Sequence, residues 1–198
     1  MLEADEALKN ISSIYTEFGN FCQKRGQVNE ADTRVKIIDR ILKEGLGWPE
    51  DAFNREVPAH AGFIDYLLQT GSRRHFVVEA KREGMAFDIP KSLKTRKRYK
   101  ISGSINTNKD IKEVIEQAHF YCVEAAVRYA VVTNGYAWLI FRAIREDIPW
   151  RDGDVLVFPG AGYIKDNFVH FWNLLSYPAV LDGSLDNNFS RPISTVTA

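Results

Sequence analysis

Two acidic residues and a lysine lie on neighbouring segments that the sequence predicts to be strands. Asp65 lies within the apolar run GFIDYLLQT, and Glu79 and Lys81 end the run HFVVEAK. Because side chains alternate along a strand, Glu79 and Lys81 share one face, and a hairpin of the two strands lets them meet Asp65. Two carboxylates about 4 Å apart repel each other by roughly 1–4 kcal/mol, so such a pair is stable mainly when a cation lies between them. The pattern therefore predicts a site for a hard divalent ion.

Mg²⁺ is the expected ion, since it prefers oxygen ligands and keeps several waters, which leaves a water positioned to attack a phosphorus atom. Lys81 would orient or activate that water. The alternative is that Glu79 and Lys81 form only a weak ion pair on a solvated strand face. A Glu-x-Lys tripeptide is expected about once by chance in a chain of this length. The apolar surroundings of Asp65 and Glu79 favour the metal site.

Helices are predicted where apolar side chains recur at spacings of three and four. The predicted helices span residues 5–24, a segment from Asn29 to Gly45, residues 109–126 and residues 163–176. We expect the first of them to be peripheral. The last stretch, residues 181–198, is rich in Ser, Thr and Asn and is expected to be a tail or a linker.

Strands are predicted where β-branched and aromatic residues gather. They cover FNREV, GFIDYLLQT and HFVVEAK between residues 53 and 81, and then YAVVTNGYAWLIFR, residues 129–142, with a two-residue turn at Asn134 and Gly135. Residues 91–108 are expected to form a loop. This order predicts an α/β fold, in which a central mixed sheet is flanked by helices. No glycine-rich phosphate loop follows a strand, which argues against ATP or NAD as a cofactor.

Several short motifs, in this order, resemble the PD-(D/E)XK nucleases and, within them, the N-terminal nuclease domain of type I restriction enzyme R subunits. The similarity covers residues 29–142, and Ile64 replaces the proline often found before the aspartate. It rests on NEADTR with Glu30, GFIDYLL with Asp65, VVEAK with Glu79 and Lys81, and QAHFY with Gln117 and Tyr121. The resemblance implies a restriction-endonuclease-like core of αβββαβ order.

The resemblance also implies which residues bind metal. Asp65, Glu79 and the carbonyl of Ala80 would be the ligands, and Glu30 would complete or tune the metal shell. The expected ion is Mg²⁺, with Mn²⁺ as a substitute.

The remaining motif residues would serve the water and the substrate. Lys81 would serve the attacking water, while Gln117 and Tyr121, one helical turn apart, would lie near the active site and the nucleic-acid backbone. Without the resemblance, Gln117 and Tyr121 are explained equally well as a polar rim beside a core aromatic. Arg34, one turn after Glu30, is expected to pair with it.

The implied activity is that of an endonuclease that hydrolyses phosphodiester bonds in DNA, expected to be double-stranded. A role in restriction or anti-phage defence, beside an NTPase or helicase domain or subunit or as a homo-oligomer, is implied as well. The alternative is a catalytically inactive module of the same fold that binds nucleic acid or a partner protein. The joint presence of Asp65, Glu79, Lys81 and Gln117 counts against that alternative.

Together these patterns divide the chain into four parts. They are an N-terminal helical extension over 1–28, the nuclease core over 29–142, a closing helical segment over 143–180, and a tail or linker over 181–198 that is expected to lead to a further domain.

Positive charge is concentrated beside the predicted catalytic strand. Residues 73–100 hold ten Lys and Arg residues against three acids, although the whole chain carries 26 charges of each sign. Clustered cations attract phosphates, so these residues are predicted to contact the nucleic-acid backbone rather than base edges. The alternative is that this basic segment is only a solvated loop that binds no nucleic acid. The residues assigned to this surface are Arg73, Arg74, Arg82, Lys91, Lys94, Arg96, Lys97, Arg98 and Lys100.

The composition, with 45% hydrophobic and 26% charged residues over 198 positions, is typical of one globular unit and excludes disordered, collagen-like and disulfide-framework proteins. Cys22 and Cys122 lie far apart and outside any zinc-binding pattern. The N-terminus is acidic and no apolar run reaches the ~18 residues that a membrane span needs. We therefore expect a cytoplasmic protein that does not bind membranes.

Overall fold

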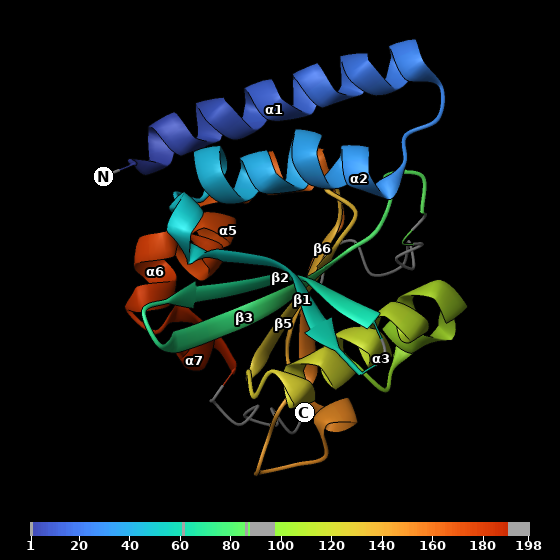
Figure 1. Cartoon of the computed structure of the whole chain (residues 1–198), viewed down its shortest axis with the longest axis vertical. Coiled ribbons are helices and arrows are strands. Elements are labelled where there is room, and N and C mark those ends of the chain that lie inside the picture. The colour runs from blue at the N-terminus through green and yellow to red at the C-terminus, as the bar shows by residue number, and fades with distance from the viewer. Residues whose placement is uncertain (1, 61, 86, 88–97, 190–198) are drawn as a thin grey trace, which may run out of the picture.

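A computed structural model of the chain describes residues 2–60, 62–85, 87 and 98–189 (Figure 1). Its centre is a seven-stranded mixed sheet with the strand order β1-β2-β3-β5-β6-β7-β4. β3 and β5 run parallel, whereas the other neighbouring pairs are antiparallel. The strands are β1 (Phe53–Ala59), β2 (Gly62–Thr70), β3 (Arg73–Ala80), β4 (Arg98–Lys100), β5 (Tyr129–Thr133), β6 (Trp138–Arg142) and β7 (Asp154–Phe158).

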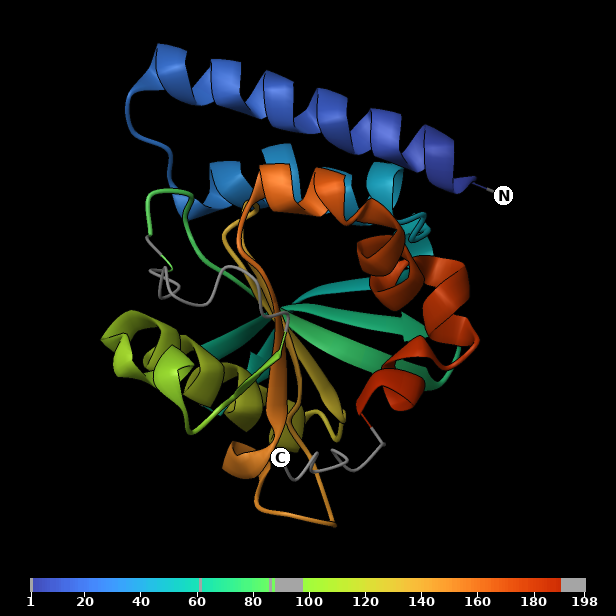
Figure 2. The same ribbon diagram turned by 180° about the vertical axis from the view of Figure 1, so that it is seen from behind.

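Helices flank this sheet on both faces (Figures 1 and 2). The α-helices are α1 (Ala4–Arg25), α2 (Glu30–Thr33), α3 (Lys109–Glu124), α4 (Ala161–Asp166), α5 (Phe168–Leu175), α6 (Tyr177–Leu181) and α7 (Ser184–Phe189). α2 continues into two π-helical turns, η1 (Arg34–Ile38) and η2 (Ile41–Gly45). Short 3-10 turns are η3 (Glu50–Ala52), η5 (Ser104–Thr107) and η6 (Trp150–Asp152).

The apolar side chains of the sheet pack into two hydrophobic cores, one on each face. The larger core joins α1, the η1 and η2 turns and the C-terminal helices to the sheet. The second core lies under α3 and includes Val77, Val132 and Ile115. Because successive strand residues point to opposite faces, β3 supplies Phe76 and Val78 to the first core and Val77 to the second. The predicted α/β fold with a mixed sheet flanked by helices is therefore confirmed.

α1 is part of the larger core, so the expectation that this helix is peripheral is wrong. Its side chains Ile11, Ile14 and Phe18 are almost completely buried. The side chain of Ile11 packs directly on Gly45 where α1 crosses η2, since a Cβ added to Gly45 would lie 2.5 Å from Cγ1 of Ile11. Only a residue without a side chain fits at that crossing.

The predicted strands of residues 53–80 and 129–142 are confirmed, but two strands were missed. β7 was not expected, and β4 lies in the segment predicted as a loop; Tyr99 of β4 pairs with Val155 of β7. The turn between β5 and β6 is also longer than predicted, because Thr133 pairs with Trp138 and four residues lie between them. The side chain of Asn134 accepts hydrogen bonds from the N–H groups of residues 136 and 137, which stabilises this longer turn.

The C-terminal part of the chain differs most from expectation. The single helix predicted over residues 163–176 is interrupted at Asn167 and forms α4 and α5. The predicted tail begins with a helix, α7, in which Leu185 and Phe189 are buried. Residues 190–198 lie outside the described residues.

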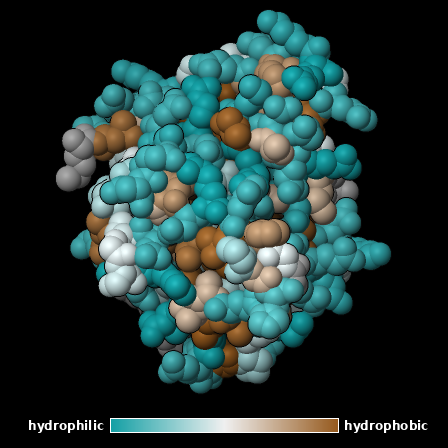
Figure 3. Space-filling view, in the orientation of Figure 1, coloured by the Kyte–Doolittle hydropathy of each residue, from teal (hydrophilic) through white to brown (hydrophobic). Residues whose placement is uncertain are grey.

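The outer surface is mainly polar. The face shown in Figure 3 is largely hydrophilic, with apolar side chains in separate patches. In the described part of the chain, none of the helices combines the length and the apolar character that a membrane crossing requires.

Candidate active site

The candidate site lies where β2 and β3 separate. Tyr66 and Val78 are the last residues that pair between these antiparallel strands. Beyond them, the backbone N–H of Ala80 donates to Oδ2 of Asp65, at 2.8 Å. On its other side β3 stays paired with β5 through Glu79 and Ala80. The carboxylate of Asp65 thus accepts the N–H of Ala80, a bond that a backbone carbonyl of the neighbouring strand would accept elsewhere in the sheet. A pocket opens beside this carboxylate.

This pocket has a volume of about 490 Å³. It brings together the six side chains predicted for the site, which come from α2, β2, α3 and the end of β3. Three further residues that the sequence analysis did not assign to the site also lie in its wall. The described residues that line the pocket are Glu30, Arg34, Glu56, Phe63, Asp65, Glu79, Lys81, Gln117 and Tyr121.

Local hydrogen bonds fix the start of α2 against the end of β3. Asn29 caps the helix, as its Oδ1 accepts from the N–H of Asp32 at 2.7 Å. The hydroxyl of Thr33 accepts from the N–H of Glu83 at 3.1 Å. These bonds tie the first turn of the helix, which carries Glu30, to the segment that follows Lys81.

A chain of hydrogen bonds runs from β3 to α3. Nζ of Lys81 donates to Oε1 of Glu79 at 2.5 Å and to Oε1 of Gln117 at 3.1 Å. Nε2 of Gln117 donates in turn to the hydroxyl of Tyr121 at 3.1 Å. Because only 2% of Tyr121 is exposed, this residue is suited to position Gln117 rather than to touch nucleic acid.

The carboxylates of the pocket are held in an environment that disfavours their charge. Burial raises the pKa of Glu79 to about 7, and the nearby charge of Asp65 adds to this shift although Lys81 opposes it. Burial likewise raises the pKa of Asp65 and of Glu30. A nearby cation would therefore stabilise all three groups in their ionised form.

Lys81 keeps its proton in this environment. Burial alone would lower the pKa of Lys81, but the attraction of Glu79, Glu30 and Asp65 together outweighs it and the pKa is raised. As an ammonium group it has three N–H donors and no lone pair. Of the two functions predicted for Lys81, the protonation state favours orienting a water molecule over deprotonating it.

Arg34 is a site residue that the sequence analysis missed. Its Nη1 lies 3.3 Å from Oδ1 of Asp65 and 3.3 Å from Oε1 of Glu56. Arg34 pairs with these two acids and not with Glu30, so the expected i,i+4 pair is wrong. A π-helical turn begins at Arg34, where the spacing of side chains departs from that of an α-helix. Such turns are frequent at functional sites and leave no clear sequence signal.

Glu56 is the second missed residue, and its backbone is strained. Its φ is +51°, a left-handed conformation that costs a residue other than glycine about 1–3 kcal/mol. The side chain is mostly exposed and contacts Arg34. With Glu56 the pocket holds four carboxylates against the cations of Arg34 and Lys81. The excess of negative charge suits a divalent cation.

The donor atoms of the pocket fit such a cation. Oε2 of Glu79 is buried and has no hydrogen-bond partner among the described residues. An unpaired carboxylate oxygen is costly to bury, and a cation would relieve that cost. Asp65 lies in the same pocket and adds carboxylate oxygen, the kind of ligand that Mg²⁺ prefers.

Glu30 does not complete an all-side-chain metal group. In the part of the chain that the structure describes, no three His, Cys, Asp or Glu side chains lie close enough to hold a metal ion. The fit therefore rests on Asp65 and Glu79, with Glu30 in the wall of the same pocket.

Of the residues predicted to contact the nucleic-acid backbone, the five that the structure describes do not form one surface. Arg82 is exposed directly after Lys81. Arg98 and Lys100 lie in β4, at the opposite edge of the sheet from β1, and both make internal contacts: Arg98 donates to the carbonyl of Asn188 at 2.6 Å, and Lys100 to that of Asp152 at 2.8 Å. Lys91, Lys94, Arg96 and Lys97 lie outside the described residues.

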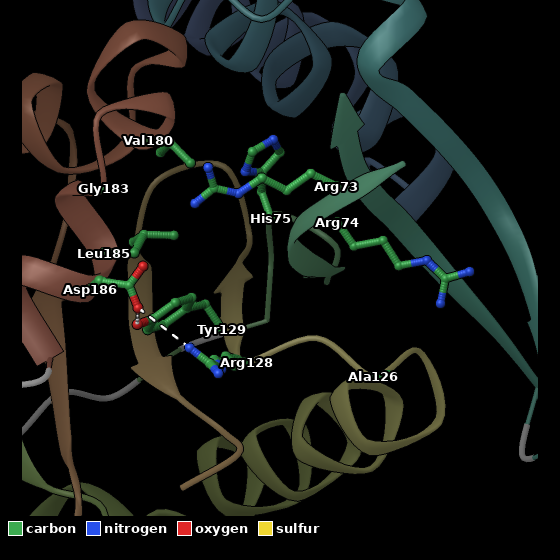
Figure 4. Close-up of a pocket in the computed structure, with 10 residues that line it drawn as sticks. All are labelled: Arg73, Arg74, His75, Ala126, Arg128, Tyr129, Val180, Gly183, Leu185 and Asp186. Atoms are coloured by element: carbon green, nitrogen blue, oxygen red, sulfur yellow. Dashed lines mark hydrogen bonds and ion pairs between the residues drawn. The ribbon is translucent and has the colours of Figure 1, made fainter. Parts of the chain in front are cut away.

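Arg73 and Arg74 are at the other end of β3 from Glu79, about 20 Å away at ~3.3 Å per residue. They line a separate cavity of about 200 Å³ between β3, β5 and the C-terminal helices (Figure 4). Figure 4 shows the guanidinium of Arg73 reaching toward Val180, whereas Arg74 points away from it. Arg74 donates to the carbonyl of Ala125 at 2.7 Å. These two arginines are thus too far from the pocket to contact the same phosphate as Lys81.

Comparisons of the chain with models of protein families, with curated proteins and with solved structures give no match.

Proposed function

We propose that this protein is a divalent-metal-dependent endonuclease that hydrolyses phosphodiester bonds in DNA. The observation that carries the proposal is the pocket in which Asp65 and Glu79 lie beside Lys81, itself hydrogen-bonded to Gln117. Hydrolysis of a phosphodiester needs a cation near the phosphate and a donor that orients the water. The two carboxylates and the ammonium group are suited to these two tasks.

Each residue has a distinct task in the proposed reaction. Asp65, Glu79 and the carbonyl of Ala80 would hold Mg²⁺ or Mn²⁺. When bound, such an ion acts as a Lewis acid that neutralises charge developing on the phosphate. Lys81 would orient the attacking water by donating a hydrogen bond to its oxygen. Gln117, anchored by Tyr121, would keep the lysine in that position.

Arg34 would bind the phosphate itself. Its Nη1 is occupied by two carboxylates, which fixes the orientation of the guanidinium plane. A guanidinium has five N–H donors in a rigid fork, so donors remain for a phosphate oxygen. Glu56 would act through Arg34 as a positioning residue.

The chain order supports a restriction-endonuclease-like core. α2, β1, β2, β3, α3 and β5 follow one another in the αβββαβ order that the resemblance implies, with the short β4 placed between β3 and α3. A role in restriction or anti-phage defence, with an NTPase or helicase as partner, belongs to the same proposal and rests on the resemblance alone.

The test is cleavage of supercoiled plasmid DNA by the purified chain in Mg²⁺ or Mn²⁺, with EDTA as the metal-free control. The variants are Asp65→Asn, Glu79→Gln and Lys81→Met, each of which removes a charge with little change in volume. We expect each to lower the cleavage rate at least about 100-fold. Glu113→Gln is the matched control, because Glu113 is an exposed residue of α3 paired only with Lys109 among the described residues.

Two results would contradict the proposal. Metal-dependent cleavage that persists in all three variants would show that the activity belongs to another site or to a contaminant. A folded chain that binds DNA and Mg²⁺ but cleaves under neither ion would favour the inactive binding module.

A further inference from the structure

Phe63 stands apart from the other residues of the catalytic pocket. It is 61% exposed, although it lies in β2 only two residues before Asp65. The other described residues of the pocket wall carry charged, amide or phenol groups. Single exposed apolar side chains are common on protein surfaces, so exposure alone means little. What distinguishes Phe63 is an open aromatic face in the wall of a pocket built from charges.

The backbone of Phe63 belongs to a paired strand that packs against α3. Phe63 pairs with Pro58 across the β1–β2 hairpin. The hairpin end is packed against α3, since a Cβ added to Gly62 would lie 3.4 Å from the hydroxyl of Tyr121. The backbone of Phe63 therefore keeps a fixed position relative to Asp65, at about 7 Å along the strand. This distance places the ring within one nucleotide of a phosphate held at the carboxylates.

The chemistry of the proposed substrate explains an aromatic group at this place. A nucleotide offers one negatively charged group and one planar aromatic group. The pocket holds the cations Arg34 and Lys81 for the first, and the exposed ring of Phe63 for the second. Stacking of bases on exposed aromatic side chains is the usual way in which proteins hold unpaired nucleic acid, and it tolerates any base because each has a π face.

An intact duplex cannot use such a ring, because the faces of its bases are covered by their neighbours. On the basis of the proposed function, we propose that Phe63 forms a nucleobase-binding site at the mouth of the catalytic pocket, and that the enzyme acts on nucleic acid with an unpaired base beside the scissile phosphate. Such a base occurs in a single strand, at a frayed end or where a nucleotide is turned out of the helix. The double-stranded DNA expected as substrate from the sequence is thereby restricted to DNA that exposes such an unpaired base.

The test measures binding separately from cleavage. The full chain is titrated, in Ca²⁺ and with a gel to verify that the DNA stays intact, against a fluorescent single-stranded oligonucleotide and the duplex of the same sequence. Phe63→Ala is expected to weaken binding of the single strand about tenfold, as loss of one stacked base predicts, and binding of the duplex less than about twofold. Phe63→Trp should retain the affinity. Val123→Ala is the matched control, because Val123 is an apolar residue of α3 that is 54% exposed.

A second measurement separates the base from the phosphate. Single nucleotides of the strand are replaced one at a time by an abasic sugar-phosphate. At one position the replacement should weaken binding to the wild type but not to Phe63→Ala, because the stacking partner is already missing. Equal affinity of the wild type and Phe63→Ala for the single strand, or equal cost of every abasic replacement in both proteins, would overturn the nucleobase site.

The two proposals fail in different ways. If cleavage depends on Glu79 but Phe63→Ala binds and cleaves single strands like the wild type, the nuclease stands and the nucleobase site is wrong. If Phe63→Ala weakens binding while no metal supports cleavage, the nucleobase site stands and the nuclease is wrong. Absence of binding to any of these nucleic acids would overturn both.

Discussion

Glu79 carries a charge that the folded protein disfavours. Its pKa is raised from 4.5 to about 7, mainly by burial and then by Asp65, so at pH between these values the folded state holds a proton that the unfolded state releases. The contribution of this proton to stability is complete below pH 4.5 and is lost as the pH rises through 7. Ionised Glu79 should therefore lower the free energy of unfolding by up to about 3 kcal/mol at pH 8.

Glu79→Gln should remove this penalty while abolishing cleavage. We expect its melting temperature to exceed that of the wild type by roughly 5 °C at pH 8, with a much smaller difference at pH 5. Thermal unfolding in EDTA at the two pH values checks this. Equal melting temperatures at pH 8 would mean that the contacts of Glu79 in the wild type already offset the cost of burying its charge. The same experiment shows that loss of activity in this variant does not result from unfolding.

Replacement of Glu56 should also lower activity without lowering stability, but the reason is backbone strain and not a buried charge. Its left-handed backbone is strained, and asparagine tolerates that conformation better than glutamate. The ion pair with Arg34 contributes little to stability because Glu56 is 69% exposed. We expect Glu56→Asn to keep or raise the free energy of unfolding by up to about 1 kcal/mol and to lower the cleavage rate about tenfold. Urea unfolding and plasmid cleavage are the measurements; a parallel fall of both would argue that Glu56 has only a structural role.

At the scale of elements, α3 ends in a motif that lacks its preferred residue. The N–H of Val127 donates to the carbonyl of Cys122 at 2.9 Å, and that of Ala126 to the carbonyl of Val123 at 3.2 Å. These bonds form a Schellman motif, whose left-handed residue is usually glycine. Here that residue is Ala126, with a φ of +51°.

Ala126→Gly should therefore stabilise the protein by about 0.5–1 kcal/mol. The change is far along α3 from Gln117, so cleavage should be unaffected. Chemical denaturation of the two proteins measures the difference. A less stable variant would show that flexibility of glycine in the unfolded chain outweighs the relief of strain.

Elements with a clear period were predictable from the sequence, whereas those set by tertiary contacts were not. α1 and α3 carry apolar residues at helical spacing, and the apolar run at β3 is typical of a strand buried on both faces. β4 has only three residues and is a strand because it pairs with β7. Such a short segment has no period of its own.

The candidate site was predictable to the extent that it depends on side-chain chemistry in strands and on α3. Asp65, Glu79 and Lys81 could be identified because charges are unusual in apolar strands. Arg34 and Glu56 could not, because their positions depend on a π-helical turn and on a left-handed backbone conformation. Neither feature follows from the residue types.

At the scale of the whole molecule, the support of the site extends to the N-terminal helix. α1 packs on the π-helical turns that follow α2, and this helical segment carries Glu30 and Arg34 into the pocket. The residues predicted as an extension therefore belong to the larger core, on the side of the helical segment that carries Glu30 and Arg34. One of their tight contacts with the rest of the molecule is that of Ile11 with Gly45.

Gly45→Ala tests this support. The new methyl group would overlap Ile11, and such overpacking costs about 1–3 kcal/mol, less the gain of up to ~1 kcal/mol from the better helix former. In an Ile11→Ala background the overlap is absent, so the same substitution should be neutral or stabilising. The coupling between the two substitutions, measured by urea unfolding of both single variants and the double variant, should reach at least about 1 kcal/mol. Additive effects would mean that α1 can move away from η2 at no cost, and that it does not hold the helix that carries Arg34.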